Sequence, residues 1–203
     1  MKTTAFTLIA IAALAFGTVN TSKAADGKNG NNTEVSTTLT EVHKVNKIEI
    51  RGNVEVFVSN GNDEKVKVYN HYYAEDAFVQ NQDGTLKISS YGNEKLVVWV
   101  TVKDVHDINV YDNAEVRSFG KLSALELNVN LYDSATANLD VDTFNASFNI
   151  DGKAKANLAG TVDQCQLSYS AGATVNQSQL KAENISQNRM AAKAANNDDL
   201  AAL

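Results

Sequence analysis

Hydrophobic and polar residues alternate over short stretches along most of the chain after residue 42. In such stretches every second side chain falls on the same face, which is typical of a β-strand with one buried face. Five of them lie in the first half, at 48–50, 54–58, 66–69, 86–88 and 96–102. Turn-forming residues such as Asn60-Gly61 and Asp83-Gly84 separate them, and no long amphipathic helix pattern precedes the C-terminal tail. The pattern predicts an all-β domain.

Similar segments follow one another at a regular spacing in the second half of the chain. Ala135, Ala154 and Ala173 each end a short polar corner and are 19 residues apart, and Ala114 precedes them by 21 residues. Segments of this length with short strands and no helix are typical of a parallel β-helix, or β-solenoid, in which each segment is one coil. We therefore expect coils of about 19–21 residues, with irregular coils or capping β-hairpins in the first half.

The alternation within two of these coils also predicts the buried side chains. Residues two positions apart on a strand point to the same face, so the apolar members of each run are expected to face inward. The expected core residues are Leu125, Leu127, Val129 and Leu131 in one coil and Phe144, Ala146, Phe148 and Ile150 in the next.

The two ends of the chain have a different composition. Residues 1–24 combine Lys2, an apolar run at 5–16 and a small-residue site at Ala24, which predicts a cleaved signal peptide. The apolar run is shorter than the roughly 20 residues that span a bilayer, so no transmembrane segment is expected in the mature chain. Residues 25–41 predict a flexible leader, and the domain is expected at 42–181. The Ala/Asn-rich tail at 182–203 leaves a short helix and a frayed end open.

Composition and charge narrow the class of partner. The chain is 203 residues long, 43% of them hydrophobic, and its 18 Lys and Arg against 24 Asp and Glu give a formal charge of −6. Nucleic-acid binding needs clustered basic residues, so an acidic chain of this kind argues against that partner. The single cysteine, Cys165, cannot form an internal disulfide, and we expect a buried structural thiol there.

The polar residues offer little catalytic or metal-binding chemistry. His43, His71 and His106 lack the spacing of a metal-binding pair, and neither a metal nor a cofactor is expected. The acid-rich segments 104–107 and 140–142 could bind calcium, but the paired-glycine calcium repeat is absent, so solvated turns are favoured. Asp112, Asp133 and Asp151 lie near successive corners, which leaves a polysaccharide-acting enzyme as the less favoured alternative.

Two features near the corners suggest a binding or modification site. Tyr111, Tyr132 and Tyr169 occupy similar places beside successive corners, so they could form an exposed aromatic ladder that stacks on sugar rings. The competing interpretation is that they only cover the edges of the coils, and Tyr169 aligns one position away from Tyr132. Ser134 lies in a short Asp-Ser-Ala sequence that has the form of a bacterial O-glycosylation site.

These segments together resemble a known family. The runs from Ile48 to Val56 and from Asp83 to Ile88, followed by the small-residue corners, are similar to the family of the putative auto-transporter adhesin, head GIN domain, from about Val45 to Leu180. The resemblance implies a right-handed β-solenoid exported by a Gram-negative bacterium, in the periplasm, on the surface or secreted. We therefore expect a non-enzymatic, adhesin-like binding protein for a glycan or an envelope protein. A purely structural component that associates with its own copies remains the other alternative.

Overall fold

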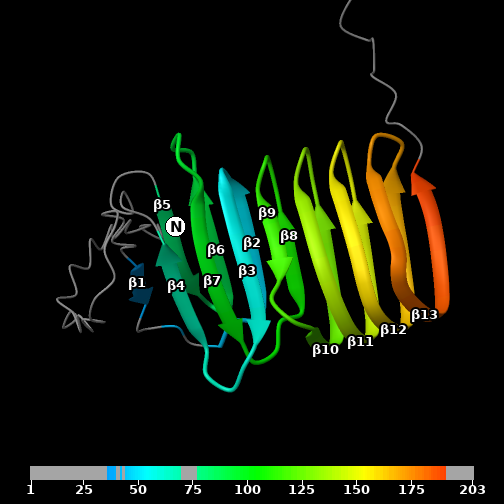
Figure 1. Cartoon of the computed structure of the whole chain (residues 1–203), viewed down its shortest axis with the longest axis horizontal. Coiled ribbons are helices and arrows are strands. Elements are labelled where there is room, and N and C mark those ends of the chain that lie inside the picture. The colour runs from blue at the N-terminus through cyan, green and yellow to red at the C-terminus, as the bar shows by residue number, and fades with distance from the viewer. Residues whose placement is uncertain (1–35, 40–41, 43, 70–76, 191–203) are drawn as a thin grey trace, which may run out of the picture. The chain divides into compact units, whose positions relative to one another are not determined.

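The structure, a computed structural model, describes residues 36–39, 42, 44–69 and 77–190 and is all-β over these residues. Over the described residues the strands form one 13-stranded sheet, and Figure 1 labels them. They are β1 (Ser36–Leu39), β2 (Lys47–Gly52), β3 (Val54–Asn60), β4 (Lys65–Tyr69), β5 (Ala77–Gln82), β6 (Thr85–Ser90), β7 (Leu96–Val102), β8 (Asp107–Val110), β9 (Glu115–Ser118), β10 (Leu122–Leu131), β11 (Thr136–Ile150), β12 (Lys155–Ser170) and β13 (Thr174–Met190). None of the described residues belongs to a helix long and apolar enough to cross a membrane.

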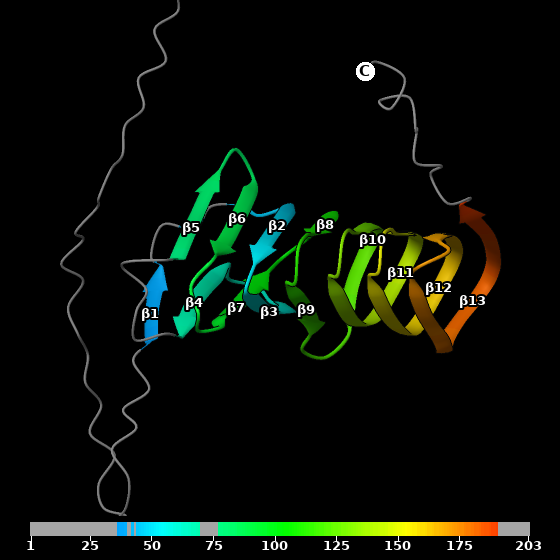
Figure 2. The same cartoon turned by 90° about the horizontal axis from the view of Figure 1, so that it is seen from above.

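Parallel pairing dominates the C-terminal part of the sheet. Strands β10 to β13 lie side by side in Figures 1 and 2, and each pairs in parallel with the next. Thr136 of β11 pairs with Lys155 of β12, and this 19-residue offset persists along the pair as far as Ile150 and Tyr169. The alanine spacing in the sequence therefore reflects the register between neighbouring strands.

The sheet as a whole is mixed, and the predicted right-handed parallel β-helix solenoid is wrong. Strands β1 and β4, β4 and β7, and β5 and β6 pair antiparallel, which gives a mixed half-barrel. Strands β1, β4 and β7 pair antiparallel although other strands separate them along the chain. For β5 and β6 the physical reason is the short connection between them, because a tight turn returns the chain antiparallel to itself. Asp83 and Gly84 form such a turn between β5 and β6 with φ values of 50° and 77°, the left-handed conformation that favours Gly and Asp. The alternative of β-hairpins in the first half is confirmed for β5 and β6.

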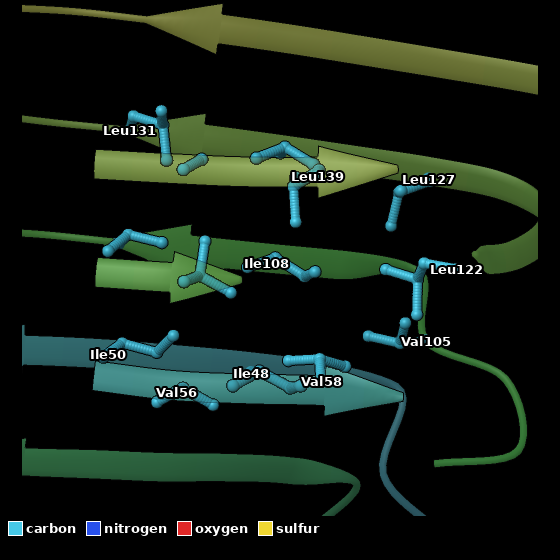
Figure 3. Packing of buried hydrophobic residues seen from close by; sticks show 14 of the residues in the cluster. Ile48, Ile50, Val56, Val58, Val105, Ile108, Leu122, Leu127, Leu131 and Leu139 are labelled. Carbon is cyan, nitrogen blue, oxygen red and sulfur yellow. The ribbon is translucent and has the colours of Figure 1, made fainter. Parts of the chain in front are cut away.

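One hydrophobic core collects the inward side chains of the whole sheet. In Figure 3, Ile48 and Ile50 of β2 lie next to Val56 and Val58 of β3, and all four are completely buried. Phe148 is the largest fully buried side chain, and Cys165 is buried as expected. Alternation of buried and partly exposed residues along β2, β3 and β7 explains why these sequences form strands with one face in the core.

The long strands β10, β11 and β12 each bend once, and the bend changes which residues are inward. One residue at each bend has no register partner on the neighbouring strand: Leu125 in β10, Phe144 in β11 and Asp163 in β12. At each bend two consecutive residues face outward, so the alternation shifts by one position. The predicted burial of Leu125 and Phe144 is therefore wrong, because they are 75% and 51% exposed, whereas the other six predicted core residues are buried.

The parts of β11 before and after its bend contribute to the same core. Leu139 and Val141 come from the first part, and Phe148 and Ile150 come from the second part. The residues that alternate with them point away from the core. The sheet therefore presents two outward faces, one on each side of the core.

The ends of the domain also depart from expectation. Residues 182–190 belong to β13, so the alternative of a helix is wrong for this part of the tail, and residues 191–203 lie outside the described residues. Strand β1 lies within the segment expected to be a leader. The predicted signal peptide at 1–24 lies outside the part of the chain that the structure describes.

Candidate functional site

The corners that precede β3, β9, β11 and β12 stack in one column. Their left-handed residues are Gly52, Asp112, Asp133 and Gly152, with φ values of 78°, 60°, 59° and 69°. Gly152 is required there, because an added Cβ would lie 2.8 Å from the Asp133 carbonyl oxygen of the neighbouring corner. Backbone hydrogen bonds join the stacked corners, for example from Ser134 N–H to the Asp112 carbonyl oxygen at 3.0 Å.

The carboxylates that were candidates for catalysis bind this corner backbone. Asp112 Oδ2 accepts a hydrogen bond from Gly52 N–H at 3.0 Å and another from the Tyr91 hydroxyl at 3.4 Å. Asp133 Oδ2 accepts from Asp112 N–H at 3.3 Å, and Asp151 Oδ1 accepts from Gly152 N–H at 2.7 Å. These bonds give the three acidic residues a structural role in holding the turns.

Two of the three candidate tyrosines lie together beside this column. The rings of Tyr111 and Tyr132 stack with centroids 4.8 Å apart and 10° between their planes. The Arg51 guanidinium lies 3.7 Å from the centre of the Tyr111 ring, so both faces of Tyr111 are covered. Tyr169 pairs instead with Ile150 and packs against the core. The structure therefore places Arg51, Tyr111 and Tyr132 in one stack and leaves Tyr169 outside it.

The second candidate position at the corners is Ser134. Its side chain is exposed at the turn, directly after the left-handed residue Asp133. O-glycosylation there stays a prediction.

Tyr132 should ionise late in an alkaline titration. Partial burial raises the pKa of its hydroxyl above the usual value of about 10, with smaller contributions from Tyr111 and Asp151. The folded state then holds this proton more tightly than the unfolded chain. Tyr132 therefore contributes stability below pH 10 that is lost as the pH rises through the folded-state pKa.

The measurement is the near-ultraviolet absorbance difference between the natural protein and the Tyr132→Phe variant as pH rises. We expect the midpoint of this difference to lie above that of the same protein unfolded in urea. A midpoint equal to that of the unfolded chain would show that the hydroxyl is fully solvated.

A groove that the sequence did not reveal lies on the outward face of β10 to β13. It encloses about 710 Å³, and its floor contains Ala146, Cys165 and Ile185. Two rows of polar side chains flank this floor, one before it and one after it along each strand. We call this site the amide groove; its rows are Glu126, Asn145, Gln164 and Asn184, and Asn128, Ser147, Gln166 and Ser186.

The amides of this groove differ from other amides on the sheet in their hydrogen bonding. Outside the groove, Asn130 Nδ2 donates to Asn109 Oδ1 at 2.8 Å, and Asn157 Nδ2 donates to Asn138 Oδ1 at 2.8 Å. Among the described residues, no side-chain hydrogen bond involves the amides of Asn145, Gln164 or Gln166. Their donors and acceptors are therefore free to bind a ligand or water.

The groove contains few ionisable groups. Glu126 supplies its one carboxylate, and burial raises the pKa of the Cys165 thiol, which disfavours the reactive thiolate. Over the described part of the chain, no group of three or more His, Cys, Asp and Glu side chains could hold a metal ion. The chemistry available in the groove is hydrogen bonding by neutral amides and hydroxyls.

Sequence reasoning missed this groove because its residues are ordinary polar members of strands. A signal was present, since Asn145 and Gln164, like Ser147 and Gln166, are neutral polar pairs separated by the same 19 residues as the corner alanines. Such a spacing places equivalent side chains next to each other on adjacent parallel strands.

Solved structures with the same fold are described as adhesins or as a lipid-binding protein. A putative adhesin from Bacteroides fragilis has a TM-score of 0.65 at 15% identity, over 81% of this chain and 80% of that one. A putative lipid binding protein from Parabacteroides distasonis has a TM-score of 0.62 at 13% identity, over 79% and 80%. A putative adhesin from Parabacteroides merdae has a TM-score of 0.57 at 15% identity, over 81% of each chain. At these identities the likeness establishes the fold alone.

Comparison by sequence gives the family. No protein with a curated function matches the chain. The family described as putative auto-transporter adhesin, head GIN domain, matches residues 44–196, which is most of the chain and includes the corner column and the amide groove. The chain therefore belongs to the family of the putative auto-transporter adhesin, head GIN domain.

Proposed function

We propose that this protein is a non-enzymatic, adhesin-like binding protein that holds a neutral glycan in the amide groove. The observation that carries the proposal is a groove of about 710 Å³ lined by amides without internal hydrogen bonds. An amide both donates and accepts hydrogen bonds, which matches the hydroxyl groups of a sugar. Membership of the adhesin head family supports a role in binding and an exported or surface location.

The arrangement of the groove favours an extended chain of sugars. Equivalent amides lie on adjacent strands, which are about 4.8 Å apart. This spacing is close to the length of one pyranose unit, so a polysaccharide that crosses the strands could present successive units to successive amides. The formal charge of −6 disfavours an acidic polymer by repulsion.

The same groove gives little support to an enzyme. Glycoside hydrolysis ordinarily requires two carboxylates on either side of the scissile bond, and Glu126 is the one carboxylate among the groove residues. Asp112 and Asp133 already accept hydrogen bonds at the corners. Binding without turnover is therefore the function that these residues support best.

The test is binding of the mature chain to immobilised xylan, mannan, barley β-glucan and dextran. We expect at least one of these neutral polymers to be bound, and the triple variant Asn145→Ala, Gln164→Ala and Gln166→Ala to weaken that binding through the groove. Each hydrogen bond contributes about 1 kcal/mol, so the affinity of the amide groove itself should fall on the order of 100-fold in the triple variant. Polygalacturonate serves as the acidic polymer for comparison.

A matched control is Gln80→Ala, which removes an exposed amide from β5, at the other end of the sheet. It should bind as the natural protein does. The proposal fails if none of the neutral polymers is bound, or if the triple variant and Gln80→Ala have the same affinity as the natural protein.

A further inference from the structure

A straight row of side chains crosses the other outward face of the sheet. Its members are register partners on six neighbouring strands, β7, β3, β9, β11, β12 and β13. On β7, β3, β11 and β12 they alternate with buried residues. At the spacing of paired strands the row spans roughly 24 Å. We call it the aromatic row; it consists of Trp99, Phe57, Arg117, Asn138, Asn157 and Asn176.

One end of the row is an aromatic cluster outside the core. The rings of Phe57 and Trp99 stack with centroids 4.8 Å apart, and the ring of Phe119 lies 5.0 Å from that of Trp99. Phe119 is 62% exposed and does not belong to the hydrophobic core. The rings of Phe57 and Trp99 face each other, and the tilted, exposed ring of Phe119 extends the cluster, so together they offer an apolar surface to the carbon-bound hydrogens of a sugar ring.

The other end of the row is a ladder of amides. Asn157 Nδ2 donates to Asn138 Oδ1 at 2.8 Å, and Asn138 Nδ2 donates to Glu115 Oε1 at 3.0 Å, so both side chains are held in fixed orientations. A second groove of about 270 Å³ runs beside them and is lined by Asn138, Asn157 and Asn176. Oriented amides beside a groove can position the hydroxyl groups of a ligand without first having to be ordered.

Salt bridges pair the charged side chains in the middle of the row. Arg117 Nε lies 2.9 Å from Glu55 Oε1, and Arg117 Nη2 lies 2.6 Å from Glu115 Oε1. Lys95 Nζ lies 3.7 Å from the other oxygen of Glu115. Salt bridges therefore match Arg117 and Lys95, whereas Lys67, the register partner of Trp99, forms none among the described residues. The row itself offers a neutral ligand aromatic contact and hydrogen bonds rather than an ion pair.

We propose that the aromatic row is a second binding site for neutral polysaccharide, on the side of the core opposite the amide groove. This inference rests on the proposed function and extends it from one site to two. A single chain then binds one polysaccharide strand on each face and cross-links them, with no need for a second copy of the protein.

Trp99 makes the second site directly observable, because it is the only tryptophan in the chain. The experiment titrates xylan, mannan, barley β-glucan and dextran into the full mature chain while tryptophan emission is recorded. We expect the polymer to shift Trp99 emission in the natural protein and in the triple variant of the amide groove. The polymer concentration at the midpoint of the shift should differ between the two proteins by no more than about twofold. Phe119→Ala should weaken this response about tenfold. Phe119→Ala is preferred to Trp99→Ala because Phe119 is largely exposed, so its removal should disturb folding less.

Light scattering by a monomeric preparation then tests cross-linking. The natural protein should increase scattering by the polymer at intermediate ratios of protein to polymer and lose this effect in excess protein. The triple groove variant and Phe119→Ala should each bind without increasing the scattering.

Two results would overturn the second site while leaving the proposed function intact. One is binding through the amide groove with no change in Trp99 emission, and the other is an emission change that disappears in the triple groove variant. Failure of every neutral polymer to bind by any readout would remove the proposed function as well.

Discussion

Replacing Gly160 with alanine is expected to destabilise the folded protein by about 4 kcal/mol. Gly160 has a φ of 105°, a conformation that residues with a Cβ rarely adopt. An added Cβ would press against the carbonyl oxygen of Val141 and lie 2.7 Å from the Val141 nitrogen on the paired strand β11. Because both obstructing atoms belong to the backbone, β11 and β12 would have to separate locally.

The matched control is Gly120→Ala. Gly120 has a φ of 79°, but no atom lies within 4 Å of the position that its Cβ would take. In Gly120→Ala the alanine must still adopt a positive φ, which costs about 1 kcal/mol, but its Cβ does not clash with a neighbouring strand. Urea unfolding followed by circular dichroism measures both variants. Equal losses of stability would show that the close approach of β11 to Gly160 has no energetic consequence.

Phe148→Ala is expected to cost about 3–5 kcal/mol of stability. Phe148 is the largest fully buried side chain and pairs with Val129 and Leu167, so its removal leaves a cavity between apolar neighbours that cannot close completely. The control is Phe144→Ala on the same strand. Phe144 is 51% exposed at the bend, and this change should cost less than about 1 kcal/mol.

The stabilities of the two phenylalanine variants are compared by their midpoints of unfolding in denaturant. If Phe144→Ala were as destabilising as Phe148→Ala, the bend would not turn Phe144 outward. The pair therefore tests the bend itself, because unbroken alternation along β11 predicts equal burial of these two residues.

Local pattern predicted the strands and most of the core, but it could not predict where the alternation would shift. Leu127 and Phe148 were placed correctly because they lie within straight parts of their strands. Leu125 and Phe144 were misplaced because two successive outward residues at a bend leave no mark in a pattern of apolar and polar residues. Pairing direction escaped prediction for a related reason, since parallel and antiparallel strands share the same period of two.

The candidate site was predicted only in part. The structure brings the rings of Tyr111 and Tyr132 together, because each follows an inward residue of paired strands by one position. Tyr169 is itself at a paired inward position and lies elsewhere. Sugar binding by these tyrosines stays a prediction. The amide groove and the aromatic row depend on which outward residues meet across strands. Phe57 and Trp99 are 42 residues apart in the sequence, and their contact follows from the register between β3 and β7, which one sequence does not reveal.

The constant 19-residue offset between β11 and β12 has a consequence for how such a chain can evolve. Duplicating one 19-residue unit there would insert one further bent strand and keep every side chain facing as before. Gain or loss of a single residue would instead turn all later side chains of that strand to the opposite face unless a bulge absorbs it, as happens between β12 and β13 after Asn157. Both outward faces would lengthen together by such duplications, so we expect descendants of this gene to differ in the length of these faces by whole 19-residue units.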